Sequence, residues 1–152
     1  MRSLVKKLQK DFPEFIFESS TEFWWSATNN TVHYDLKTAD GNAFLLHELS
    51  HAVLGHVGYQ CDIDLIKLER DAWEYAKSSL GPHYDAPIDE STAEDNLDTY
   101  REWLHSRSTC PDCSATGLQM KQQHYRCLDC GAIWRVNEAR LCSLRRYSLQ
   151  TK

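Results

Sequence analysis

The stretch with the clearest chemical potential covers residues 47–51, His-Glu-Leu-Ser-His, inside an apolar run over residues 43–56. Histidines four positions apart on an α-helix leave the same face one turn apart, so His47 and His51 can bind one zinc ion at ~2.0–2.1 Å per nitrogen. Glu48 follows the first histidine, and in this motif such a glutamate acts as a general base toward water. The pattern is short, so two ordinary helix histidines are the alternative interpretation.

The elements around this motif favour a buried site. Apolar residues surround most of the helix circumference, which is typical of a buried helix, and burial strengthens the electrostatic effect of a metal ion. Turn residues Asp40-Gly41-Asn42 precede the helix, and Asp40 is a possible N-cap. Gly55 and Gly58 after the motif are a reasonable stop for this helix.

A catalytic zinc site generally has three protein ligands and one open position. His56 does not fit the HExxHxxGxxH pattern, because the glycine of that pattern would fall at Leu54 and its last histidine at Val57. Helical periodicity returns over residues 62–79. Glu69 lies on that second helix, far enough after His51 for a turn and an antiparallel return.

Other interpretations of the second helix stay open. Glu74 and Asp71 are lesser candidates for the third ligand, and Glu69 could instead be an exposed carboxylate paired with Arg70 or a lysine. Asp71 and the residues after it could lie behind the ligands, where the small Ala72 would permit a close helix approach.

The sequence HELSHAVLGH at residues 47–56, followed by ERDAWEYA at residues 69–76, resembles the ImmA/IrrE-like metallopeptidases and, more broadly, the gluzincins. The resemblance covers roughly residues 1–105. It implies His47, His51 and Glu69 as zinc ligands, Glu48 as the base, and an edge strand that holds an extended substrate. It also implies selective cleavage of a protein partner, often a transcriptional regulator. Trp73 departs from the family pattern, which usually has Asn or Asp after this alanine.

The sequence on either side of the two motifs predicts the remaining helices and strands of residues 1–105. A helix is expected over residues 2–10, a strand over 14–18, and a hairpin of residues 22–28 and 31–35 around Asn29-Asn30. Gly81-Pro82 should end the second helix, and a third helix over residues 91–104 should begin at Ser91, with Glu94 completing a capping box. Candidate groups for polarising a substrate carbonyl are His83, His33 and Tyr34, each with a structural role as the alternative.

Four cysteines in two CxxC pairs, Cys110 with Cys113 and Cys127 with Cys130, predict a structural zinc ribbon. Four thiolates leave no open position, and redox thiols or disulfides are the alternative. A hairpin over residues 118–127, a last strand over 132–136, a short basic helix over 138–147 and a frayed end over 149–152 complete this module. The two remaining cysteines, Cys61 and Cys142, are expected to be free thiols.

Charge divides the chain. The net charge is −10 over residues 1–100 and +5 over residues 101–152. Basic residues and aromatic residues alternate in the ribbon, so it could contact nucleic acid, although docking to protein or simple stabilisation fits as well. No signal peptide or membrane span is visible, which predicts a cytoplasmic protein without a membrane partner.

These patterns together predict an α+β fold. A small zincin-like domain over residues 1–106 would combine a short twisted sheet with the active-site and glutamate helices, and a four-cysteine zinc ribbon with a basic tail would occupy residues 107–152. The predicted function is a zinc metalloendopeptidase with one catalytic and one structural Zn²⁺, acting on an intracellular protein or peptide. A non-catalytic adaptor for nucleic acid or protein is the alternative, and a non-proteolytic zinc hydrolase is a third possibility.

Overall fold

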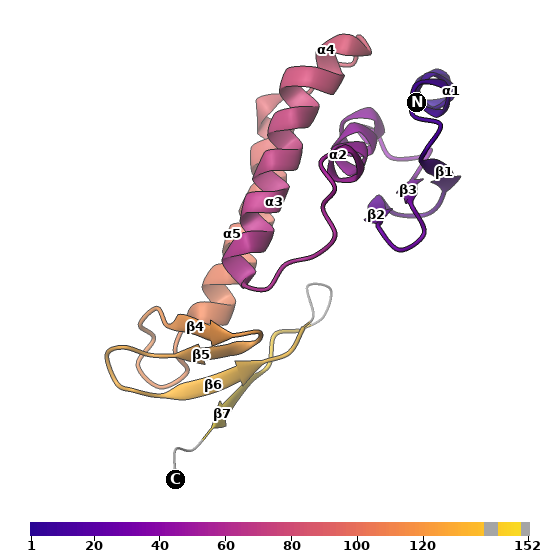
Figure 1. The fold of residues 1–152 in the computed structure, drawn as a ribbon. Coiled ribbons are helices and arrows are strands. Elements are labelled where there is room, and N and C mark those ends of the chain that lie inside the picture. Colours follow the sequence, from indigo (N-terminus) through magenta and orange to yellow (C-terminus); the bar gives the residue numbers. More distant parts are fainter. Residues whose placement is uncertain (139–142, 150–152) are drawn as a thin grey trace. The chain divides into compact units, whose positions relative to one another are not determined.

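Two separate β-sheets and several helices make up the described residues, 1–138 and 143–149, in a computed structural model (Figure 1). The chain forms two units, one from Met1–Val57 with Leu68–Glu94 and one from Gly58–Lys67 with Asp95–Lys152. The α+β class predicted from the sequence is confirmed. The domain boundary between residues 106 and 107 stays a prediction. Among the described residues, no helix is long and apolar enough to span a membrane.

The first sheet has three strands, β1 (Ile16–Ser19), β2 (Trp24–Ser26) and β3 (Thr31–Tyr34), in the order β1-β3-β2. β2 and β3 form the predicted antiparallel hairpin, and β1 pairs with β3 in parallel. Asn30 in the turn has a φ of 55°, a left-handed conformation that asparagine tolerates. β2 therefore lies at an edge of the sheet.

Helices α1 (Arg2–Asp11) and α2 (Gly41–Val53) bury their apolar residues in one core with this sheet. α1 buries Leu4, Val5 and Leu8 along one stripe, and α2 is apolar around most of its circumference, as expected for a buried helix. Asp40 precedes α2, but its side chain makes no capping hydrogen bond. Fully buried members of the core are Leu8, Val32, Leu45, Leu46, Leu49 and Ala76.

The second helix extends further than the sequence predicts. α3 (Asp62–Tyr75) continues into a π-helical segment, η1 (Ala76–Leu80), and then into α4 (Gly81–His83). The prediction that Gly81-Pro82 ends the helix is wrong. The wide turn lets the N–H of Gly81 bond to the carbonyl of Ala76, and Pro82 lies in the first turn of α4, a position that proline tolerates.

The next helix, α5 (Glu90–Ser108), begins one residue earlier and ends four residues later than predicted. Ser91 lies inside it, so the predicted cap at Ser91 is wrong. Asp89 directly precedes the helix, and its side chain accepts a hydrogen bond from the N–H of Ser91 at 3.3 Å. Leu97 and Tyr100 on this helix are buried.

The second sheet is antiparallel throughout, in the order β4 (Leu118–Lys121), β5 (His124–Arg126), β6 (Ile133–Val136) and β7 (Arg146–Leu149). The predicted hairpin and the strand at β6 are confirmed. We call these four strands the C-terminal sheet. Figure 1 shows them side by side, in orange to yellow.

β7 replaces the predicted basic helix and frayed end, because residues 146–149 pair with the free edge of β6. Asn137 holds the returning chain: its side chain accepts from the N–H of Arg145 at 2.8 Å and donates to the carbonyl of Ser143 at 3.1 Å. Residues 139–142 and 150–152, which these predictions also covered, lie outside the described residues.

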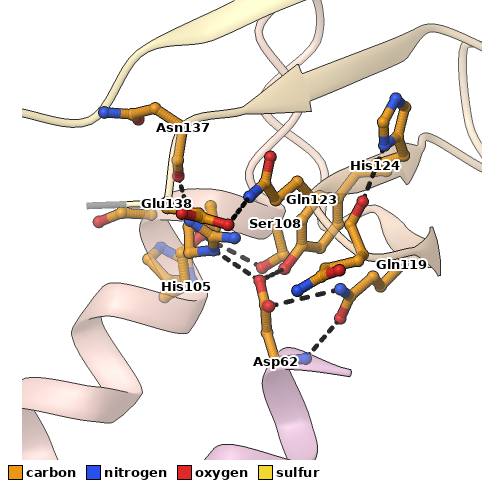
Figure 2. A network of polar contacts seen from close by, with 12 residues as sticks. Asp62, His105, Ser108, Gln119, Gln123, His124, Asn137 and Glu138 are labelled. Atoms are coloured by element: carbon orange, nitrogen blue, oxygen red, sulfur yellow. Dashed lines mark hydrogen bonds and ion pairs between the residues drawn. The ribbon is translucent and has the colours of Figure 1, made fainter. Parts of the chain in front are cut away.

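A buried charge network lies at the start of α3 (Figure 2). The Asp62 carboxylate accepts hydrogen bonds from Arg107 Nε at 2.5 Å and from the hydroxyl of Tyr125, and Gln119 bonds to both the side chain and the backbone N–H of Asp62. Arg107 also donates to the carbonyl of Asn137. Asp62 and Arg107 are 1% and 2% exposed, so each charge depends on the other.

Candidate metal centres

Three buried side chains converge on one point. The Nε2 atoms of His47 and His51 are 3.1 Å apart, and the Oε2 atom of Glu69 lies 3.1 Å and 3.5 Å from them. Zinc ligands at ~2.0–2.1 Å in tetrahedral geometry lie ~3.3–3.4 Å from one another. The spacing and the donor set therefore fit a three-ligand zinc site.

Two helices place these groups. His47 and His51 lie one turn apart on α2, and Glu69 lies on α3. The other carboxylates that the sequence left open point elsewhere: Asp71 is exposed and pairs with Arg70 at 2.8 Å, and Glu74 is exposed near Lys77. The structure thus brings Glu69 to the histidines and leaves its alternatives in solvent.

The charges of Glu69 and of the two histidines shift one another's pKa values. Burial disfavours ionised Glu69, but hydrogen bonds from His47 and His51 outweigh it and lower the pKa of this carboxyl well below its usual range. Burial also opposes protonation of His51, yet the hydrogen bond and charge of Glu69 raise the pKa of that imidazole. A carboxylate that stays ionised next to two imidazoles is a donor set ready for a divalent cation.

The far side of the His51 ring faces His56. The two Nδ1 atoms are 2.9 Å apart, and Gly55, with a φ of 70°, turns the chain so that the His56 ring comes back toward α2. If Nε2 of His51 binds a metal, its Nδ1 carries the proton and donates it to His56. Burial and the His51 charge lower the pKa of His56, which keeps it neutral and able to accept. Sequence reasoning considered His56 only as a ligand and missed this role.

Trp73 takes the position behind His47. Its ring stacks on the His47 imidazole with centroids 4.1 Å apart and an interplanar angle of 21°, and Phe44 meets Trp73 edge-on at 5.8 Å. The Nδ1 atom of His47 is buried and has no hydrogen-bond partner among the described residues. Aromatic packing by Trp73 thus orients the His47 ring by shape.

Glu48 lies on α2 between the two histidines in sequence, and the backbone N–H of Trp25 on β2 has a small lowering effect on the pKa of its carboxyl. Burial raises the pKa of Glu48, while the charges of His47 and His51 oppose that rise. The indole of Trp25 donates to the carbonyl of His56 at 2.9 Å. The side chain of Trp25 therefore joins the edge strand β2 to the chain segment just after α2.

The three candidates for polarising a carbonyl lie away from these contacts. His33 stacks on Trp24 at 3.8 Å, on the opposite face of the sheet from Val32, and Tyr34 is buried in the core. His83 packs edge-on against Tyr84 at 4.7 Å. The structure brings none of the three into contact with the triad among the described residues.

The four cysteines of the CxxC pairs form a second cluster. Sγ of Cys110 lies 3.6 Å from Sγ of Cys130, and Sγ of Cys113 lies 3.5 Å from Sγ of Cys127, close to the ~3.8 Å expected for tetrahedral ligands with Zn–S near ~2.3 Å. Gly131, directly after the second CxxC pair, has a φ of 77°, which glycine adopts without strain.

Backbone N–H groups lie against two of these sulfurs, those of Cys110 and Cys127. The N–H groups of Cys130 and Asp129 lower the pKa of Cys127 to about 7, although burial opposes them, and the N–H of Asp112 donates to Sγ of Cys110 at 3.4 Å. Cys61 is a free thiol, as predicted, and Cys142 lies outside the described residues.

Comparison with known protein families, with curated proteins and with solved structures found no match. Fold and sites by themselves define an α+β protein with two candidate metal centres, one of buried His, His and Glu and one of four cysteines.

Proposed function

We propose that this protein is a zinc-dependent metallopeptidase, with a zincin-like active site and a C-terminal zinc ribbon. The observation that carries the proposal is the buried convergence of His47, His51 and Glu69, with Glu48 beside them on α2. Bound zinc would polarise the scissile carbonyl and make water acidic enough to attack near neutral pH. The four cysteines leave no open position, so a zinc there would be structural.

The role of Glu48 follows from its place in the motif. Its carboxylate would take a proton from the attacking water and deliver it to the leaving amine. His51 would be held in the ligating tautomer by His56, and the His47 ring would be kept in place by Trp73. Glu48 would therefore move a proton, His56 would fix the proton of His51, and Trp73 would fix the orientation of the His47 ring.

A peptide substrate is supported by the edge strand. β2 has one unpaired edge in its sheet, and the N–H of Trp25 points to the carboxylate of Glu48. An extended peptide could add alongside β2 by backbone hydrogen bonds and so bring a scissile bond next to Glu48. The resemblance to the ImmA/IrrE-like enzymes favours a particular protein partner inside the cell as the substrate.

The test is Glu48→Gln in the full, zinc-loaded chain. The probe is a peptide library prepared from a digested proteome, with cleaved bonds identified by mass spectrometry. We expect wild-type protein to cleave peptides at defined bonds, and the variant to lose about 10²–10⁴-fold of that activity while it keeps its zinc and its melting temperature. Glu74→Gln, which changes an exposed carboxylate on α3, is the matched control and should cleave like the wild type.

Two results would contradict the proposal. If every peptide bond cleaved by the wild-type protein is also cleaved by Glu48→Gln, or if neither protein cleaves any, the adaptor interpretation takes precedence. If ester or amide substrates of low molecular weight are hydrolysed but peptides are not, the site belongs to a non-proteolytic hydrolase.

A further inference from the structure

The outer face of the C-terminal sheet follows from its strand register. Residues that are directly paired in an antiparallel sheet project on the same side. The pairs Leu118–Arg126, His124–Arg135 and Arg135–Tyr147 therefore share one face. The opposite face carries Tyr125 and Trp134, which are buried and stacked on each other at 5.6 Å. The first face is thus the one turned away from the core of this sheet.

This outer face carries positive charge without compensation. Lys121, Arg126 and Arg135 are exposed, and none of them has an ion-pair partner among the described residues. No strand of the C-terminal sheet contains Asp or Glu. The remaining strand cation, Arg146, pairs with Val136 on the other face and donates to the carbonyl of Ser106 at 2.6 Å.

The same face exposes flat and apolar side chains between the cations. Tyr147 is 40% exposed and Leu149 is 41% exposed, although both lie in a paired strand. The guanidinium of Arg135 lies over the Tyr147 ring, 5.0 Å from its centroid. A guanidinium and an aromatic ring held in this way present planar groups that an unpaired base can stack against.

We propose that the outer face of the C-terminal sheet is a binding surface for single-stranded nucleic acid. Arg126, Arg135 and Lys121 contact phosphates, and Tyr147 with the Arg135 guanidinium stacks on bases. A duplex fits less well, because its base faces are covered by neighbouring base pairs. An acidic peptide would satisfy the cations but would leave the exposed ring without a planar partner.

The experiment uses the full, zinc-loaded chain and fluorescent 12-nucleotide probes of mixed sequence, as single-stranded DNA, single-stranded RNA and duplex DNA. Anisotropy is measured over a series of salt concentrations. We expect the single strands to bind at least about tenfold more tightly than the duplex, and the DNA and RNA arms show which sugar is preferred. The variant Tyr147→Leu should weaken single-strand binding at least about fivefold.

The charge variant is Arg126→Gln with Arg135→Gln, and it should reduce the slope of log affinity against log salt by about 1.4, since ~0.7 is lost per phosphate contact. The matched control is Arg101→Gln, an exposed arginine that pairs with Asp98 on α5 and should bind like the wild type. Zinc content and circular dichroism check that each variant is folded.

Three results would overturn the proposal. One is no binding of any single strand at low salt, and another is equal or tighter binding of the duplex. The third is an unchanged affinity for Tyr147→Leu together with full competition by a polyglutamate peptide, which would identify a general site for polyanions or acidic peptides.

Discussion

At the level of single residues, the His47–His51–Glu69 site depends on which ring atoms are free to bind. The two Nε2 atoms face Glu69, and the two Nδ1 atoms have unlike surroundings, a histidine for His51 and no hydrogen-bond partner among the described residues for His47. Groups behind a ligand fix its tautomer and raise its basicity. His51 should therefore be the more tightly oriented of the two imidazoles, and His56 is the residue to change.

His56→Ala should weaken zinc binding at the His47–His51–Glu69 site by about 10–100-fold, because His51 loses the acceptor for its Nδ1 proton. Titration against a chelating dye measures this affinity, with the cysteine site already filled. His56→Asn, whose amide oxygen can accept the same hydrogen bond, should recover part of the loss. His83→Ala serves as the control, and wild-type affinity in His56→Ala would show that the His51–His56 contact does not support the site.

At the level of elements, α3 carries chemistry at two separate places. Asp62 at its first residue belongs to the buried network with Arg107 and Tyr125, and Glu69 belongs to the candidate metal centre with His47 and His51. The network is a buried ion pair with nearly every polar atom bonded, the condition under which such a pair is tolerated. Removal of one partner leaves a charge without a counterpart.

Asp62→Ala should lower the free energy of unfolding by about 3–5 kcal/mol, because the Arg107 charge and the Tyr125 hydroxyl lose their acceptor while buried. Urea denaturation followed by far-UV circular dichroism measures the change. Asp98→Ala removes an exposed partner of Arg101 and should have little effect. Similar losses in the two variants would argue against a structural role for the buried network.

At the level of the whole molecule, two metal centres in one chain should fill and empty independently. We expect elemental analysis to give two zinc ions per wild-type chain and one in Glu69→Ala. Cys127→Ser should also retain one zinc, but the C-terminal sheet should lose structure, because metal binding to so small a module supplies much of its folding free energy. One zinc per chain in both wild type and Glu69→Ala would contradict a metal at the His47–His51–Glu69 site.

Local chemistry explains what the sequence could predict of the site and the fold. The spacing of His47 and His51 within one helix, and of each CxxC pair within one turn, depends only on nearby backbone geometry. The helix, the strand and the hairpin that precede residue 36 were predicted on the same basis. Glu69 required one further inference, that the next helix returns alongside the first, and the structure brings its carboxylate to the histidines.

The sequence by itself determined which residues are candidate metal ligands, since ligand type and local spacing are properties of short segments. Only the tertiary structure decided what lies behind those residues: His56 at His51, Trp73 on His47, and the N–H of Trp25 at Glu48. It also decided that residues 146–149 form a strand, because β6 offered an edge that no local pattern reveals. Such contacts join segments whose meeting depends on the packing of the whole chain, and local propensity does not encode them.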